Sequence, residues 1–266
     1  MTTSTAPSPV TEVPAALPRI LEEQSGRVRW ITVNRPGKHN AFAPGVLAEL
    51  SAAFDRAEQD AGVAAVVVTG AGTKAFVAGN DVEALAAMSP VAAYRDMVAG
   101  HKLMQRIHDF PKPTVAAVNG YALGGGFELA LACDFIVATT TAKFGFPEIA
   151  LNTMPGWGGT QLAVLKMGLV RAKEMVLTGN HYRVDDCLPF GFISRVVAPE
   201  TLRAQAQSFA ESLTRHHPVA QEMAKRAVNR AAEMPLHAGL EFEAATYAFN
   251  FGTPHAREGF RRFLEK

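Results

Sequence analysis

The alternation of polar and apolar residues predicts a β-strand near the start of the chain. Residues 27–34 (RVRWITVN) alternate in character and are followed by Arg35-Pro36-Gly37, which indicates a turn. Residues 44–61 carry apolar side chains at helical spacing, and residues 63–69 (VAAVVVT) form a short β-branched run typical of a strand covered on both faces. This order of strand, helix and strand predicts a βαβ unit.

The same kind of pattern continues and then becomes mostly helical. Residues 94–109 predict a helix that Pro111 and Pro113 end, and residues 114–119 and 135–138 predict buried strands. After Gly158 we expect helices at 161–167, 171–178, 202–213, 220–234, 236–249 and 255–264. We therefore predict an α/β protein with a disordered tail at 1–18, an α/β core at 19–200 and a C-terminal helical region at 201–266.

Composition narrows the class of protein. A chain of 266 residues fits one sizeable core, and a net charge of +1 without a basic run argues against nucleic-acid or anionic membrane binding. No stretch approaches the roughly 20 apolar residues of a membrane span, and the Ser-, Thr- and Pro-rich start lacks the features of a signal peptide. With only Cys133 and Cys187, we expect no disulfide framework and a cytoplasmic protein.

Several common catalytic motifs are missing from the sequence. The segment 70–74 (GAGTK) lacks the spacing of a phosphate-binding P-loop, and no GxGxxG, HExxH or GxSxG occurs. We therefore expect no dinucleotide-binding site of the GxGxxG type, no catalytic metal and no serine nucleophile.

Two carboxylates stand in unusually apolar company. Glu128 lies in GYALGGGFELALACD and Glu148 in FGFPEIALN. Taken singly, Glu128 fits a first-turn residue that interacts with the helix dipole, and Glu148 fits a loop acid beside a proline. Both segments also contain glycines, and apolar surroundings raise the pKa of a carboxyl, as does a second carboxylate nearby. The pair therefore predicts a site that holds an acid and a base near neutral pH.

The glycines add a second element to this predicted site. Successive glycines at a helix N-terminus, as at Gly124 to Gly126, let free backbone N–H groups approach an oxygen and stabilise an enolate or oxyanion. A matching donor could come from the loop Ala78-Gly79-Asn80-Asp81, which we also expect to follow a strand.

At this point the chain resembles the crotonase, or enoyl-CoA hydratase/isomerase, superfamily. The resemblance covers almost the whole chain from about Arg27 and rests on six motifs in the right order. These are NRPGKHNAF (34–42), AFVAGNDVEAL (75–85), PKPTVAAVNGYALGGGFELALACD (111–134), FGFPEIALNTMPGWGGTQL (144–162), EMVLTG (174–179) and EGFRRFLEK (258–266). It implies a spiral of repeated ββα units with a C-terminal helical trimerisation region, and hydration of a 2-enoyl-CoA to a 3-hydroxyacyl-CoA.

The resemblance also implies roles for individual residues. The backbone N–H groups of Asn80 and Gly125 match the family's oxyanion hole, although Asn80 replaces the usual Ala and its side chain reaches toward the acyl site. Glu128 matches the acid that takes a proton from water, and Glu148 the acid that protonates the α-carbon. Gly156 matches the loop N–H that helps to place the water.

Other matching positions concern the substrate and the assembly. The resemblance places Ala78, Asp81 and Val82 at the substrate, and Phe146 and Trp157 beside the acyl group, where hydratases often have Gln and Ala. Lys38, Lys74 and Lys266 are candidate partners of the coenzyme A phosphates, and Phe263 belongs to an apolar stripe that covers a neighbouring subunit's site. Coenzyme A is then part of the substrate, no separate cofactor is implied, and the assembly is a homotrimer or a dimer of trimers.

Alternative functions stay open at this point. Isomerases of the family work with only the acid at the Glu148 position, and other members are acyl-CoA lyases of related chemistry. One branch binds RNA through a lysine-rich first helix, but here residues 44–61 carry Glu49, Asp55, Glu58 and Asp60 against Arg56 alone. A non-catalytic acyl-CoA-binding protein would be expected to lack one of the two acids.

Overall fold

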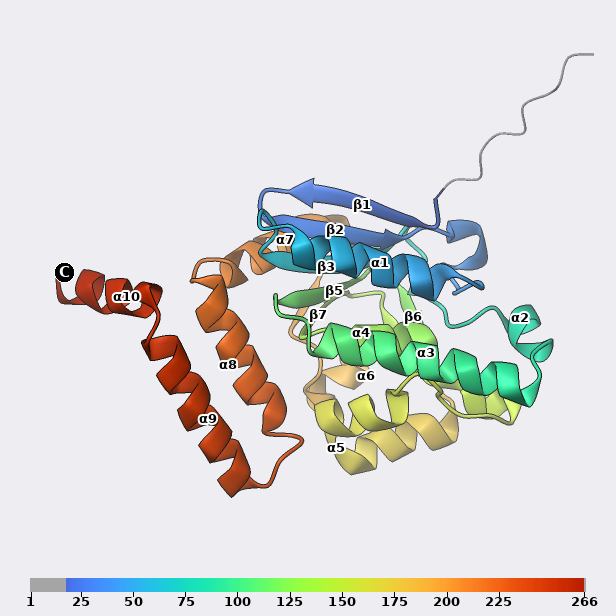
Figure 1. Ribbon diagram of the computed structural model, residues 1–266. Coiled ribbons are helices and arrows are strands. Elements are labelled where there is room, and N and C mark those ends of the chain that lie inside the picture. Colours follow the sequence, from blue (N-terminus) through green and yellow to red (C-terminus); the bar gives the residue numbers. More distant parts are fainter. Residues whose placement is uncertain (1–17, 266) are drawn as a thin grey trace, which may run out of the picture.

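A unit of two strands followed by a helix repeats along the first two thirds of the chain. The computed structural model describes residues 18–265 (Figure 1). The units comprise β1 (Ile20–Ser25), β2 (Val28–Val33) and α1 (Val46–Gln59); β3 (Ala65–Gly70), β4 (Ala75–Val77), α2 (Val82–Ala86) and α3 (Pro90–His108); β5 (Thr114–Val118), β6 (Tyr121–Leu123) and α4 (Gly125–Ala132); and β7 (Phe135–Thr139), β8 (Lys143–Gly145) and α5 (Gly159–Thr178). The predicted spiral of ββα units is confirmed.

The strands form two sheets. The six-stranded sheet has the order β1-β2-β3-β5-β7-β10, and the four-stranded sheet has the order β4-β6-β8-β9, where β9 is Tyr182–Arg183 and β10 is Arg195–Val197. Only the outer pairs β1–β2 and β8–β9 are antiparallel within the described chain. From the second unit on, the first strand of each pair enters one sheet and the second strand enters the other, which produces the spiral.

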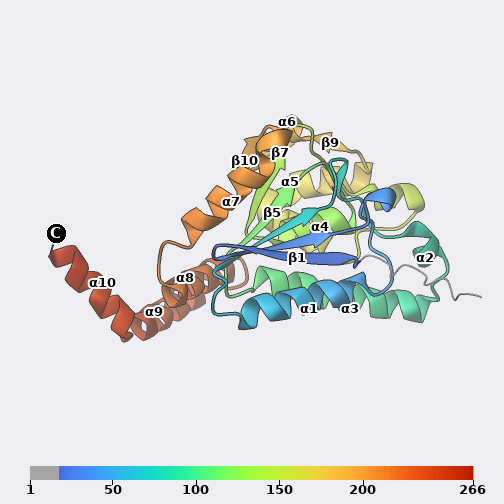
Figure 2. The ribbon, with the colours of Figure 1, turned by 90° about the horizontal axis from the view of Figure 1, so that it is seen from above.

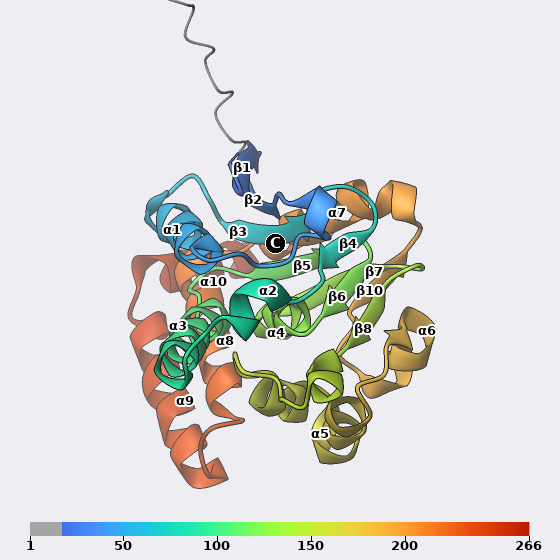
Figure 3. The same ribbon diagram turned by 90° about the vertical axis from the view of Figure 1, so that its right-hand side faces the viewer.

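Helices cover both faces of the larger sheet, as Figure 2 shows. Helix α7 (Leu202–Leu213) packs on one face through Leu202, Ala206 and Ala210, whereas α1, α3 and α4 lie on the opposite side. Helix α4 also contacts β4 and β6 of the smaller sheet, so it packs against strands of both sheets (Figure 3). Because β3 and β5 are covered on both faces, their sequences are continuous apolar runs, as the sequence predicted.

The chain ends in helices that extend away from the sheets. The short helix α6 (Val184–Cys187) precedes β10 and α7. The helices that follow α7 are α8 (Pro218–Arg230), α9 (Leu236–Phe251) and α10 (Pro254–Leu264), which Figure 1 shows in orange and red beside the core. Within residues 18–265, no helix combines the length and the apolar character that crossing a bilayer requires. The predicted disordered tail at 1–18 falls outside the described residues except for Pro18.

Differences from the predicted elements have local causes. Helix α3 begins at Pro90, four positions before the predicted start, because the Ser89 hydroxyl caps Ala92 N–H and Pro90 occupies the first turn. The strand expected before the loop 78–81 is present as β4, whereas β6 and β8 were not predicted, since three residues are too few to show a period. Cys133 and Cys187 are both buried and free, in agreement with the expected absence of a disulfide.

Candidate active site

Helix α4 holds Glu128 at the centre of the molecule. All eight residues of this helix are buried, including Glu128. Phe127 packs against Phe144, Phe146 and Phe192, with ring centroids 4.8 to 5.4 Å apart. Full burial of a phenylalanine stabilises a fold by about 1.5–3 kcal/mol. This cluster anchors α4 and so places the neighbouring carboxyl group.

Glycines bring the start of α4 against β4 and the loop that follows it. A Cβ at Gly126 would lie 2.0 Å from the Val77 carbonyl oxygen, and one at Gly125 would lie 2.8 Å from Asn80 Oδ1. Gly124 precedes the helix with a φ of +49°, which a residue with a side chain rarely adopts. These contacts explain why glycines occupy positions 124 to 126.

Two backbone N–H groups remain available at this junction. Gly79 O and Asp81 N both bond to Phe42, but the intervening Asn80 N–H donates no hydrogen bond within the described part of the chain. Gly125 is the first residue of α4, so its N–H has no acceptor in the helix. Both N–H groups belong to segments in direct contact and are candidates to bind one oxygen atom.

The Glu128 carboxyl is fixed by backbone donors. Its Oε1 accepts hydrogen bonds from the N–H of Trp157 at 2.8 Å and of Gly159 at 2.7 Å. A Cβ at Gly159 would lie 2.9 Å from this oxygen, so the donor approaches closely because it lacks a side chain. Glu128 is only 2% exposed.

Glu148 reaches the same place from a separate segment. It lies in the short 3-10 helix η2 (Pro147–Leu151), and its Oε1 is 2.7 Å from where a Cβ on Gly124 would stand. Its Oε2 is buried and has no hydrogen-bond partner among the described residues. A buried, unpaired carboxyl oxygen is costly unless a ligand or water satisfies it.

Burial raises the pKa of both carboxyl groups to about 7. For Glu128 the hydrogen bonds from Gly159 and Trp157 act in the opposite direction, and the charge of Glu148 adds to the increase. For Glu148 burial is again the main cause. The predicted raised pKa values are confirmed, and the pair can exchange protons near neutral pH.

A cavity of about 170 Å³ adjoins this junction. Its lining includes Asn80, Asp81 and Trp157, as the sequence suggested for residues near the substrate, and further residues from the segment 42–47, α2 and α3. Phe146 was expected to shape the acyl pocket, but it does not line this cavity. Phe146 is fully buried against Phe127, because it belongs to the aromatic cluster that anchors α4.

The loop after Glu148 supplies more contacts than the sequence suggested. Glu128 accepts hydrogen bonds from Trp157 and Gly159 of this loop, and the expected role of the Gly156 N–H in placing a water stays a prediction. Gly156 itself packs on α3, where a Cβ would lie 2.0 Å from Met97 Sδ. The contribution of Gly159 was missed, although the repeated glycines of GWGG were a signal for it.

Some of the residues predicted to contact coenzyme A lie near the Asn80 loop, whereas others lie elsewhere. Ala78 and Asp81 flank the Asn80 loop, and Val82 is exposed at the start of α2. Lys38 is exposed in the first turn, at the end of η1 (Pro36–Lys38). Phe263 is 77% exposed on α10, which contacts α9 and lies apart from α4 in a single chain (Figure 1). Lys266 lies outside the described residues.

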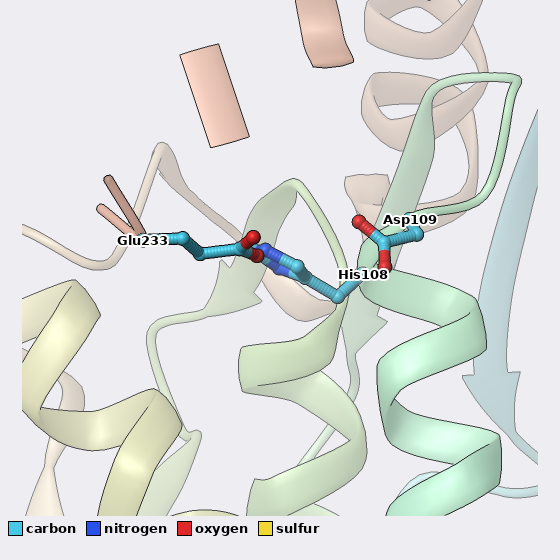
Figure 4. A group of neighbouring side chains, drawn as sticks. All are labelled: His108, Asp109 and Glu233. Carbon is cyan, nitrogen blue, oxygen red and sulfur yellow. The ribbon is translucent and has the colours of Figure 1, made fainter. Parts of the chain in front are cut away.

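One group of possible metal ligands lies elsewhere. Atoms of His108, Asp109 and Glu233 lie within 4.8 Å of one another, and Figure 4 shows the imidazole beside the Glu233 carboxylate. Glu233 is already paired with Arg230. His108 ends α3 twelve residues beyond Asp96, which lines the cavity, so it lies about 18 Å along the helix axis. This group is separate from the two acids.

Known proteins resemble this chain over most of its length. The model of the enoyl-CoA hydratase/isomerase family matches residues 23–266. The chain belongs to this family. The match includes every element that contributes to the site, from the turn before α1 to α5.

Individual members of the family are similar over nearly their whole length. The short-chain-enoyl-CoA hydratase of Clostridium acetobutylicum is 35% identical over 94% of this chain and 96% of its own. The probable mitochondrial enoyl-CoA hydratase of Dictyostelium discoideum is 40% identical, over 92% and 87% respectively. The crystal structure of an enoyl-CoA hydratase from Bacillus anthracis superposes with a TM-score of 0.89 at 33% identity, over 93% and 96%.

Proposed function

We propose that this protein is an enoyl-CoA hydratase that adds water to a 2-enoyl-CoA and forms a 3-hydroxyacyl-CoA. The observation that carries the proposal is the meeting of two carboxyl groups, that of the buried Glu128 and that of the half-buried Glu148, at the N-terminus of a glycine-led helix. Relatives at 34 to 40% identity bear the name enoyl-CoA hydratase or crotonyl-CoA hydratase. Members of the family that move a double bond without adding water need one acid fewer.

The thioester oxygen of the substrate binds between the N–H groups of Asn80 and Gly125. When the double bond takes up water, negative charge develops on this oxygen as an enolate forms. Two fixed backbone donors at the positive end of α4 stabilise that charge, and each such donor typically contributes a factor of about 10²–10³ in rate. The glycine at 125 allows the oxygen to approach the backbone.

The two glutamates divide the proton transfers between them. Ionised Glu128, held by Trp157 and Gly159, accepts a proton from water as the oxygen bonds to the β-carbon. Protonated Glu148 donates its proton to the α-carbon, so the product gains one water in total. Gly156 N–H helps to hold the water. With both pKa values near 7, the ionised and the protonated carboxyl coexist at neutral pH.

Coenzyme A enters as part of the substrate, and the reaction needs no separate cofactor. Its contacts come from the segment Ala78, Asp81 and Val82, from Lys38, and from Lys266. We further propose a homotrimer or a dimer of trimers in the cytoplasm, in which Phe263 of one subunit covers the site of its neighbour. The exposed apolar side chains of α9 and α10 support an assembly of this kind.

The proposal is tested with a panel of enoyl-CoAs of different acyl groups, by following the ultraviolet absorbance of the conjugated thioester. Loss of absorbance with formation of 3-hydroxyacyl-CoA is expected. If no member of the panel is hydrated, the proposal is wrong. Conversion of a 3-enoyl-CoA to a 2-enoyl-CoA that persists in Glu128→Gln would instead identify an isomerase, since that reaction uses only Glu148.

A further inference from the structure

The Trp157 indole occupies a space that two distant glycines leave open. The side chain is 2% exposed. A Cβ at Gly100, in the middle of α3, would lie 2.1 Å from indole Cδ1, and a Cβ at Gly125 would lie 3.0 Å from Cζ3. Glycine within a helix is unfavourable, so its presence at position 100 is explained by close packing against this ring.

Further contacts hold the indole in one orientation. Its ring lies 5.1 Å from the ring of Phe42, and its Nε1 donates a hydrogen bond of 3.2 Å to Asp96 Oδ2. The backbone N–H of the same residue donates to Glu128. Because main chain, ring face and ring nitrogen are all engaged, the side chain cannot rotate aside to admit a longer ligand.

The indole also forms part of the cavity wall beside the candidate oxyanion hole. The other lining residues come from the segment 42–47, from Asn80 and Asp81, from residues 84–88 and from Asp96 of α3. The volume of about 170 Å³ is close to that of an apolar protein cavity of about 150 Å³ that binds benzene. The space therefore accommodates about six carbon atoms.

From these contacts we propose that the Trp157 indole limits the substrate to short acyl chains, of about six carbons or fewer. The inference rests on the proposed hydratase function and adds the residue that sets the substrate class. When the thioester oxygen binds at Asn80 and Gly125, a longer acyl chain contacts the indole. The indole can occupy this position because residues 100 and 125 are glycines without side chains. Trp157 is thus a residue of specificity in addition to its backbone contact with Glu128.

The experiment compares kcat/KM for enoyl-CoAs of four, six, eight, ten and twelve carbons. For the unchanged protein we expect a fall of at least about tenfold between the six- and ten-carbon substrates, since one methylene can change kcat/KM by about tenfold or more. Trp157→Ala should raise the ratio of ten-carbon to four-carbon kcat/KM by about tenfold or more. The milder Trp157→Phe should raise the same ratio by a smaller factor. Both variants keep the N–H that binds Glu128.

Trp30 provides a matched control. It is also 2% exposed, and its indole donates to a side chain, Gln207, at 2.7 Å, but it packs against the α7 side of the large sheet. Trp30→Phe should leave the chain-length ratio unchanged. A ratio that changes equally in the Trp30 and Trp157 variants would show a general loss of packing and would overturn the proposal.

The unchanged protein alone already decides part of the question. Equal kcat/KM from four to twelve carbons would overturn the limit on chain length while leaving the hydratase function intact. Absence of hydration at every length would reject the hydratase function. In that case the affinity of saturated four- and ten-carbon acyl-CoAs, measured by calorimetry, still tests the limit: equal affinities reject it and weaker binding of the longer chain supports it.

Discussion

The α/β core and the C-terminal helices differ in how far they bury their apolar side chains. The largest fully buried side chains all lie between Ile31 and Phe146, in or beside the strands and helices of the ββα units. Helices α8, α9 and α10 contain no buried residue among those described. Several of their large apolar side chains are exposed, with Leu236 at 78%, Tyr247 at 62% and Phe263 at 77%. The core therefore has a packed interior and also exposes apolar side chains on α5, among them Val170 and Leu177. The C-terminal helices, in contrast, bury none among the described residues and present surface suited to contact with another subunit.

Charged groups differ between the two regions in the same way. Glu148 lies in the core with its pKa raised to about 7 by burial. Glu258 lies on α10, where hydrogen bonds from Arg261 and Arg262 lower its pKa to about 2. A carboxyl held near neutrality without a cation is useful for proton transfer, whereas one paired on an exposed helix stabilises little. Glu148 and Glu258 therefore differ in surroundings: Glu148 is half-buried without a cation partner in the described part of the chain, whereas Glu258 lies on the exposed helix and is ion-paired.

The largest effect is expected from removing either core acid. Glu148→Gln and Glu128→Gln should each lower kcat by about 10²–10⁴-fold, the usual contribution of a positioned acid or base, while acyl-CoA binding persists. Absorbance kinetics and calorimetry measure the two quantities. Glu258→Gln on α10 is the control and should leave kcat unchanged. Near-normal turnover in either core variant would contradict the two-acid mechanism.

The pH dependence of stability should also separate the two regions. For Glu128 and Glu148 the folded pKa is about 7 and the reference value is 4.5. The unfolded chain therefore ionises first as pH rises, and each group lowers the free energy of unfolding between pH 4.5 and 7 by on the order of 3 kcal/mol. Urea denaturation at pH 5 and pH 8 should show this fall.

Glutamine variants provide the control for this measurement. Glu128→Gln and Glu148→Gln should each reduce the fall in unfolding free energy between the two pH values. Glu258 has the opposite sign, since its lowered pKa stabilises the fold above pH 4.5 and that contribution is lost as pH falls toward 2. Equal pH dependence in the Glu128 variant and the unchanged protein would show that burial does not raise this pKa.

One substitution, glycine to alanine, should have opposite effects in the two regions. At Gly126 a Cβ would lie 2.0 Å from the Val77 carbonyl oxygen, so Gly126→Ala should destabilise the protein by about 1–3 kcal/mol. At Gly239, in α9, an added Cβ would meet no atom of the described chain within 4 Å beyond the local helix backbone, and Gly239→Ala should stabilise the helix by up to about 1 kcal/mol. Thermal and urea unfolding measure both. Destabilisation at Gly239 would indicate that a subunit contact fills this space.

The smallest effect on the fold is expected from exposed apolar residues of α10. Phe263→Ser should change the intrinsic stability of the core by no more than about 0.5 kcal/mol, because the side chain is exposed. If α10 contacts a neighbouring subunit as proposed, the variant should lower the mass measured by light scattering. Arg262→Ser, on the same helix, is the control and should leave the mass unchanged. An unaltered mass for Phe263→Ser would argue against this contact.

The longer elements of the core were predictable from local patterns. The strand predicted at 63–69 appears as β3 (Ala65–Gly70), and the helix predicted at 202–213 appears as α7 (Leu202–Leu213), because each has a run long enough to show its period. The short strands β6 and β8 were missed. They exist because neighbouring units pair with one another, and a three-residue sequence does not encode its partner.

The sequence by itself determined the ingredients of the site: the glycines before Glu128, the second acid at Glu148, and the apolar surroundings that raise their pKa values. Tertiary structure alone decided which groups complete it. Gly159 N–H reaches Glu128 across 31 positions, Phe146 enters the aromatic cluster, and Gly100 on α3 admits the Trp157 indole. The physical reason is that local pattern reports the burial of a residue, whereas hydrogen-bond partners and close packing depend on segments that meet only in the folded chain.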